Sequence, residues 1–76
     1  MLILKLIKKV KNQVEYEYFV EGVGDPGRIV AVDGEILEIE LSKDDAVDTY
    51  ACMAMGKIRK FFESGEFPEK CSVAFY

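Results

Sequence analysis

The chain has 76 residues, of which half are hydrophobic and about a third are charged, and its formal net charge is −4. This length predicts a single domain spanning residues 1–76 and leaves no room for a second core. The composition excludes a disordered chain. The acidic balance argues against a general nucleic-acid binder, because such binding neutralises phosphates with Lys and Arg.

Two segments with alternating apolar and polar residues begin the chain. Residues 2–10 and 14–21 alternate with period two and are rich in branched and aromatic side chains, which predicts two strands. We interpret Lys11, Asn12 and Gln13 as a three-residue turn, which would place Val10 opposite Val14. The predicted core face of this hairpin consists of Leu2, Leu4, Leu6, Val10, Val14, Tyr16, Tyr18 and Val20.

A glycine-rich loop follows, and its Gly22-x-Gly24-x-x-Gly27 spacing formally matches the dinucleotide-binding fingerprint. That fingerprint works where a strand turns into a helix whose N-terminus binds the pyrophosphate. Here strands are predicted on both sides of the loop, and Pro26 removes a backbone donor. We therefore reject a nucleotide site.

The next two strands are predicted at residues 28–32 and 35–41, joined by Asp33-Gly34, a dipeptide favoured in type I′ turns. This turn pairs Val30 with Leu37. The more apolar face of the hairpin comprises Val30, Val32, Leu37, Ile39 and Leu41, and the mixed face comprises Ile29, Ala31, Ile36, Glu38 and Glu40.

The period changes to that of a helix after Ser42, a favourable N-cap residue, and Gly65 is a plausible left-handed stop. The apolar stripe of the predicted helix consists of Val47, Tyr50, Ala51, Ala54, Ile58 and Phe61. Residues 70–76 alternate again and predict a final strand. The expected fold is therefore α+β, in the order ββββαβ, with two hairpins in a mainly antiparallel sheet and the helix packed on one face.

The chemistry of the side chains favours no catalytic, metal or cofactor site. The chain has no His, and Cys52 and Cys71 match no zinc or redox spacing. Capping and the helix dipole account for Asp44, Asp45 and Asp48. Without a secretory signal or a membrane-spanning stretch, we expect a cytoplasmic protein with reduced thiols and no membrane contact.

A lone helix covers one face of the sheet, so apolar residues on the other face should seek a partner. We expect a non-enzymatic interaction domain that forms a homodimer or binds another protein, through the uncovered face or an edge strand. The expected interaction surface is Ile3, Ile7, Phe19, Ile29 and Ile36.

Two alternatives remain open. One is a small-ligand or catalytic site between sheet and helix, with Cys52, Tyr50 or an aspartate as the reactive group and an unknown ligand. The other, which the net charge disfavours, is a weak nucleic-acid contact through Lys5, Lys9, Arg59 and Lys60.

Overall fold

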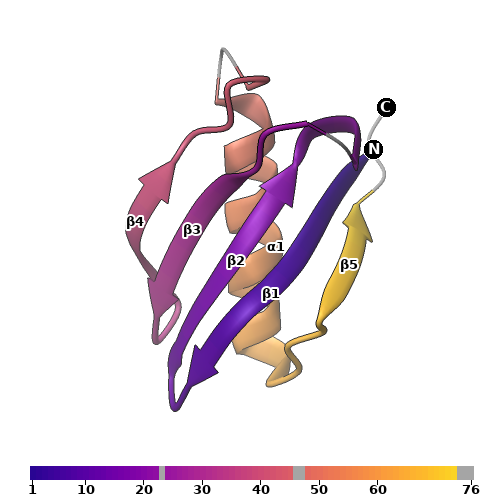
Figure 1. Ribbon diagram of the computed structural model, residues 1–76. Coiled ribbons are helices and arrows are strands. Elements are labelled where there is room, and N and C mark those ends of the chain that lie inside the picture. The colour runs from indigo at the N-terminus through magenta and orange to yellow at the C-terminus, as the bar shows by residue number, and fades with distance from the viewer. Residues whose placement is uncertain (23, 46–47, 74–76) are drawn as a thin grey trace.

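The computed structural model describes residues 1–22, 24–45 and 48–73. In chain order the elements are β1 (Leu2–Val10), β2 (Gln13–Phe19), a short 3₁₀ turn (Val20–Gly22), β3 (Gly27–Val32), β4 (Glu35–Glu40), α1 (Thr49–Ser64) and β5 (Lys70–Val73). The strands form one antiparallel sheet in the order β4-β3-β2-β1-β5, and α1 packs on one face of it (Figure 1). This confirms the predicted ββββαβ fold. The helix carries the chain from one edge of the sheet to the other.

The first hairpin has the predicted core face except at Val10, which lies on the opposite face and is 51% exposed, and its register differs from the predicted one. Val10 pairs with Gln13, so the turn has two residues rather than three, and its first residue, Lys11, has a positive φ of 53°. The ladder then shifts by one residue between Leu6 and Lys8, which leaves Ile7 as a β-bulge. The two-residue turn shifts the pairing of β1 with β2 by one residue relative to the predicted register. Without the bulge, this shift would turn Leu2, Leu4 and Leu6 away from the core, and the extra residue at Ile7 returns them to the core face.

The second hairpin turns at Asp33-Gly34 as predicted, with φ values of 52° and 87°. The faces of β3 are the reverse of those expected. In β4 the prediction is wrong for Ile36, which lies on the helix side, but it is correct for Ile39, which lies on the helix side, and for Glu38 and Glu40, which lie on the opposite face. Tyr16 pairs with Ile29, and because directly paired residues share a face, Ile29 lies on the helix side of the sheet. The predicted pairing of Val30 with Leu37 is also wrong, since Val30 pairs with Glu38 across a second register shift.

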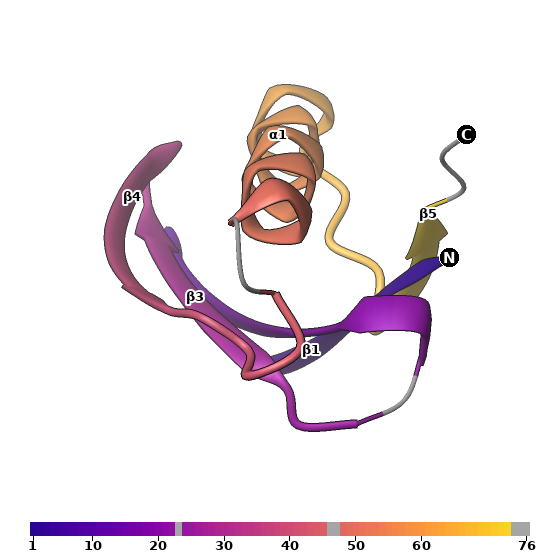
Figure 2. The same cartoon turned by 90° about the horizontal axis from the view of Figure 1, so that it is seen from above.

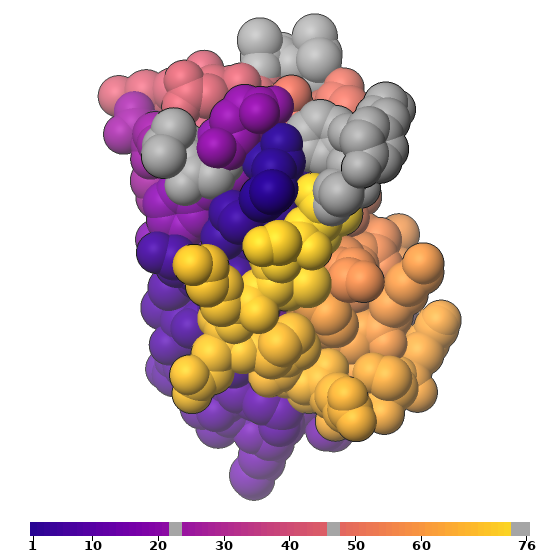
Figure 3. All heavy atoms as spheres, turned by 90° about the vertical axis from the view of Figure 1, so that its right-hand side faces the viewer, coloured from indigo at the N-terminus to yellow at the C-terminus, as the bar shows by residue number. Residues whose placement is uncertain are grey.

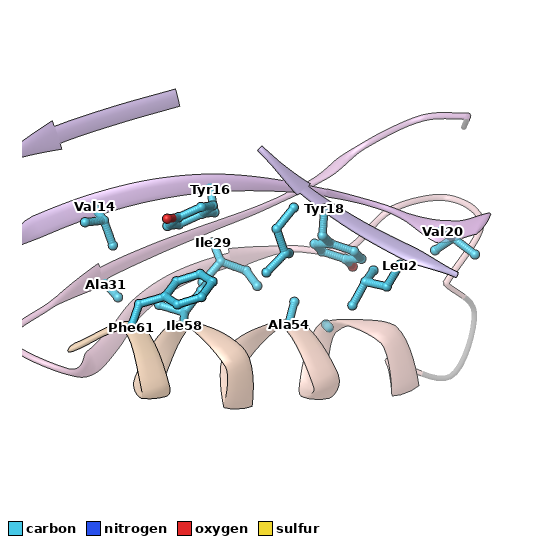
Figure 4. Close-up of a cluster of buried hydrophobic side chains, with 12 residues drawn as sticks. Leu2, Val14, Tyr16, Tyr18, Val20, Ile29, Ala31, Ala54, Ile58 and Phe61 are labelled. Carbon is cyan, nitrogen blue, oxygen red and sulfur yellow. The ribbon is translucent and has the colours of Figure 1, made fainter. Parts of the chain in front are cut away.

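The helix contributes the other half of the core. Ala51, Ala54, Ile58 and Phe61 are buried against β1, β2 and β3, as Figure 4 shows for the strand residues that point towards the helix. The helix ends as predicted at Gly65, which has a φ of 78° and donates its N–H to the carbonyl of Phe61 at 2.8 Å. Of the predicted apolar stripe, Val47 lies outside the described residues, as do residues 74–76 of the predicted last strand.

The helix begins later than the sequence predicts, and Ser42 is not its N-cap. Ser42 is buried, and its hydroxyl accepts the N–H of Asp44 at 3.1 Å, which stabilises a turn before the helix. The first helical N–H groups are instead satisfied by the Asp45 carboxylate, which accepts from Tyr50 at 3.2 Å and from Ala51 at 3.0 Å. A carboxylate there is favoured by the positive end of the helix dipole.

Candidate functional site

The structure divides the five predicted interaction residues between two sides of the sheet. Ile29 is fully buried and Ile36 packs against the same core cluster, so neither lies on the uncovered face. The expectation failed for these two because the pairing of β2 with β3 turns Ile29 towards the helix. Ile3 and Phe19 are paired on the face opposite the helix, and Ile7 occupies the bulge with half of its surface exposed.

Charged side chains cover much of the face opposite the helix. Across the sheet, one row contains Lys70, Lys5, Glu17, Arg28 and Glu40, and the next contains Lys8, Glu15, Val30 and Glu38. Val30 is only 6% exposed although the helix does not cover it. Near β3 and β4 this face therefore exposes little apolar surface, whereas Ile7 and Val10 of β1 are about half exposed.

Arg28 lies at the centre of the charges near β4. Its guanidinium is 3.2 Å from Glu38, 3.5 Å from Glu40 and 3.6 Å from Glu15, so it contacts two residues of β4 and one of β2. These ion pairs are largely exposed, and each contributes little to stability. Their effect is to orient Glu38 and Glu40 along the edge strand.

The exposed large apolar side chains form two groups. One group, in or next to β1, is Met1, Ile7 and Val10, and the other, along β4 and the residue after it, is Leu37, Ile39 and Leu41. Leu37, Ile39 and Leu41 are 60%, 42% and 50% exposed. The sheet curves around α1, with β4 at one edge and β5 at the other, and β4 extends beyond the cover of the helix (Figure 2). An edge strand presents one row of backbone N–H and C=O groups to the solvent, so β4 combines unsatisfied hydrogen-bonding capacity with apolar side chains.

From the sequence we placed Leu37, Ile39 and Leu41 on the more apolar face of the hairpin and did not predict that these side chains are exposed. A signal for their true position is present in the sequence. Two residues separate Glu35 from Glu38, whereas one separates Glu38 from Glu40. The glutamates of β4 are therefore not spaced by the even number of residues that keeps side chains on one face of a strand, and the irregular step coincides with the bulge at Leu37.

A second feature is an open hollow of about 600 Å³ between the last turns of α1 and the segment leading into β5. It is lined by Lys57, Lys60, Phe61, Ser64, Glu66, Phe67, Pro68 and Cys71. A further hollow of about 330 Å³ shares Lys57 and Lys60 and continues along the helix to Met53 and Val73. Figure 3 views the molecule from this side, where β5 and the segment before it lie beside α1. We call the two hollows together the α1–β5 groove.

The reactive groups considered from the sequence do not line this groove. Cys52 is exposed on the helix, and Tyr50 lies near Glu21, with 3.5 Å between their side-chain oxygens. The buried aspartate, Asp45, accepts hydrogen bonds from the hydroxyl of Tyr18 and from two backbone N–H groups. The free thiol beside the groove is that of Cys71.

Tyr18 and Asp45 form a structural network rather than a reactive pair. The Tyr18 hydroxyl donates to Asp45 at 3.0 Å and accepts the N–H of Ser42 at 3.0 Å. Burial raises the pKa of Tyr18 to about 12, and its hydrogen bond to the Asp45 carboxylate acts in the same direction, while the Ser42 N–H opposes it. A neutral tyrosine at physiological pH connects β2, the residues before the helix and the start of the helix.

The basic residues proposed for nucleic-acid contact are not brought together into one patch. The Lys5 ammonium lies 5.0 Å from the centre of the Phe19 ring, on the face opposite the helix. The Lys9 ammonium lies 5.2 Å from the centre of the Phe67 ring in the segment after the helix, beside the groove that Lys60 also lines, and Arg59 is exposed on the helix.

No protein-family model, curated protein or solved structure matches the chain. Within residues 1–22, 24–45 and 48–73, no group of three or more His, Cys, Asp or Glu side chains is placed to hold a metal ion. None of the helical residues described forms a segment long and apolar enough to span a membrane.

Proposed function

We propose that this chain is a small non-enzymatic interaction domain that binds an extended segment of another protein along the β4 edge of its sheet. The observation that carries the proposal is the exposure of Leu37, Ile39 and Leu41, at 60%, 42% and 50%, on and beside an edge strand. An added strand would gain main-chain hydrogen bonds from the edge and bury these side chains, which is how sheet edges recognise peptides. Binding of this kind requires no catalytic group.

The other surfaces support such binding less well. On the part of the opposite face formed by β2, β3 and β4, ion pairs surround Arg28, so a partner would have to displace charged side chains to reach Val30. At the opposite edge, β5 has four residues, and its exposed side chains are those of Lys70 and Ser72. Within residues 1–22, 24–45 and 48–73, β4 offers the longer and more apolar edge.

A test begins with selection of binders from a displayed library of random nine-residue peptides against the immobilised chain. Binding is then measured in solution, and amide hydrogen exchange locates the bound peptide. We expect exchange in β4 to slow on binding, because an added strand protects the outward-facing amides of the edge.

Matched variants separate edge binding from general apolar contact. Leu37→Lys with Leu41→Lys should abolish binding, since both side chains are at least half exposed and lie at the proposed interface. Ile7→Lys with Val10→Lys, at positions 50% and 51% exposed in β1, makes the same chemical change elsewhere and should leave binding intact. Selected peptides that protect another strand, or that bind the first variant normally, would contradict the proposal.

A second candidate is a small ligand in the α1–β5 groove. Its support is the volume of about 600 Å³, which is in the range of known ligand pockets, together with the aromatic residues and Lys57 and Lys60 in its lining. An apolar carboxylate would suit this combination. Titration with a medium-chain fatty acid, followed by the NMR signals of residues 57–71, tests it, and Lys57→Glu with Lys60→Glu should remove the response. Unchanged signals at millimolar ligand would eliminate this candidate.

A further inference from the structure

The charge of the β4 edge restricts the partner it can accept. Strands β2, β3 and β4 together contain five glutamates, Glu15, Glu17, Glu35, Glu38 and Glu40, and Arg28 is their one basic residue. The lysines of the sheet lie in β1 and β5, on the other half. The edge that exposes apolar side chains is therefore also the acidic edge.

The register of β4 separates its two kinds of side chain. Glu38 pairs with Val30 and Glu40 pairs with Arg28, so both glutamates lie on the face opposite the helix. Ile36 and Ile39 pair with Ala31 and Ile29, which belong to the core cluster on the helix side. A strand added to this edge would meet acids on one of its faces and apolar side chains on the other.

A second copy of the chain is a poor occupant of this edge. When two β4 strands pair antiparallel about a two-fold axis perpendicular to the sheet, equivalent faces of the two copies lie on the same side of the joined sheet. The Glu38 and Glu40 side chains of both copies would then lie together, and like charges opposite each other on paired strands destabilise the pairing. Arg28 compensates for only part of this charge, since each copy contributes a single guanidinium near its own edge.

We infer that the β4 edge selects an extended segment in which basic residues alternate with apolar ones. The basic side chains would lie beside Glu38 and Glu40, and the apolar ones beside Ile36 and Ile39. This inference rests on the proposed binding of a strand at β4 and specifies the chemistry of the partner. Each favourable cross-strand charge pair should improve affinity by roughly 1.4- to 5-fold relative to a neutral residue.

The test uses three synthetic nine-residue peptides with identical apolar residues at alternate positions. The intervening positions carry Lys in the first peptide, Gln in the second and Glu in the third. With one pair formed at each of Glu38 and Glu40, we expect the Lys peptide to bind about tenfold more tightly than the Glu peptide. Raising the salt concentration should reduce this preference, because exposed charges are screened. Amide exchange in β4 reports whether each peptide lies on the edge.

Charge variants of the protein test the assignment to particular residues. Glu38→Lys with Glu40→Lys should invert the order of the peptides. Glu63→Lys with Glu69→Lys changes the net charge equally on exposed positions of α1 and of the segment before β5, and should preserve the order. Because the first variant leaves Arg28 among like charges, Glu38→Gln with Glu40→Gln is a milder substitute that should abolish the preference without inverting it.

The possible results separate the preference for a basic and apolar segment from the proposed binding of a strand at β4. Equal protection of β4 by all three peptides, or a preference for the Glu peptide, would overturn the inference and leave strand binding at β4 standing. Failure of every peptide to protect β4 would overturn both. A homodimer in sedimentation equilibrium that dissociates in the Leu37→Lys, Leu41→Lys variant would also overturn the inference, by showing that a second copy occupies the edge.

Discussion

Gly27 is the position where the smallest substitution should have the largest structural effect. It pairs with Tyr18, and a methyl group placed on Gly27 would lie 2.0 Å from Cε1 and 2.2 Å from Cζ of the tyrosine ring. The ring cannot move away cheaply, because its hydroxyl is bound both to the carboxylate of Asp45 and to the N–H of Ser42. We therefore expect Gly27→Ala to destabilise the fold.

The size of the effect follows from these contacts. Overpacking a filled core costs roughly 1–3 kcal/mol, and displacing the Tyr18 hydroxyl sacrifices two buried hydrogen bonds of about 1 kcal/mol each. We expect a loss of about 3 kcal/mol in the free energy of unfolding. A domain of this length has roughly 4–11 kcal/mol in total, so the variant should fold and its loss should be measurable.

Urea denaturation followed by circular dichroism measures the loss, and Gly56→Ala provides the matched control. Gly56 lies inside α1, and a methyl group there would meet nothing within 4 Å, so the same substitution should raise stability by about 1 kcal/mol through helix propensity. The reasoning is refuted if Gly27→Ala lies within about 0.5 kcal/mol of the unsubstituted protein, the range of ordinary surface changes.

Three further predictions concern the hydrogen-bond network, alkaline pH and the bulge. Asp45→Asn should cost about 1–3 kcal/mol in urea denaturation, because an amide cannot accept all three hydrogen bonds that reach the carboxylate; an unchanged midpoint would contradict this. Burial raises the pKa of Tyr16 and Tyr18 from 10.0 to about 12. The contribution of these neutral tyrosines to the free energy of unfolding is therefore complete below pH 10 and is lost as the pH rises towards 12. At pH 11 the loss should be about 1.4 kcal/mol per tyrosine, and Tyr18→Phe should show a shallower decline than the unsubstituted protein. Deletion of Leu37 should cost less than about 1 kcal/mol, because this residue is the unpaired extra one in β4; a deletion that unfolds the chain would refute the assignment of the bulge.

Local sequence patterns predicted the elements of this fold well. Alternation located β1 to β4 within one or two residues, Asp33-Gly34 specified its turn, and Gly65 specified the end of the helix. Each of these features depends on neighbouring residues alone, because turn conformations and a left-handed cap are set by local backbone geometry.

The start of the helix could not be predicted in the same way. Ser42 has the side chain of a good N-cap, but its hydroxyl is used in a turn and its N–H donates to Tyr18, a residue of β2. The cap is supplied by Asp45, whose carboxylate is also fixed by Tyr18. Whether Ser42 or Asp45 caps the helix depends on Tyr18, which is distant in the sequence, so tertiary packing decides where the helix begins.

The candidate binding edge escaped prediction for a related reason, which also explains its chemistry. In the unbulged register, Glu38 and Glu40 would share a face with Ile36, and β4 would be mixed on both sides. The extra residue at Leu37 reverses the alternation halfway along the strand, so that Ile36 and Ile39 both lie on the helix side. Glu38 and Glu40 then join Arg28 on the opposite face. One unpaired residue therefore separates the strand into an apolar side and an acidic side, and this separation is what a strand of alternating basic and apolar residues could recognise.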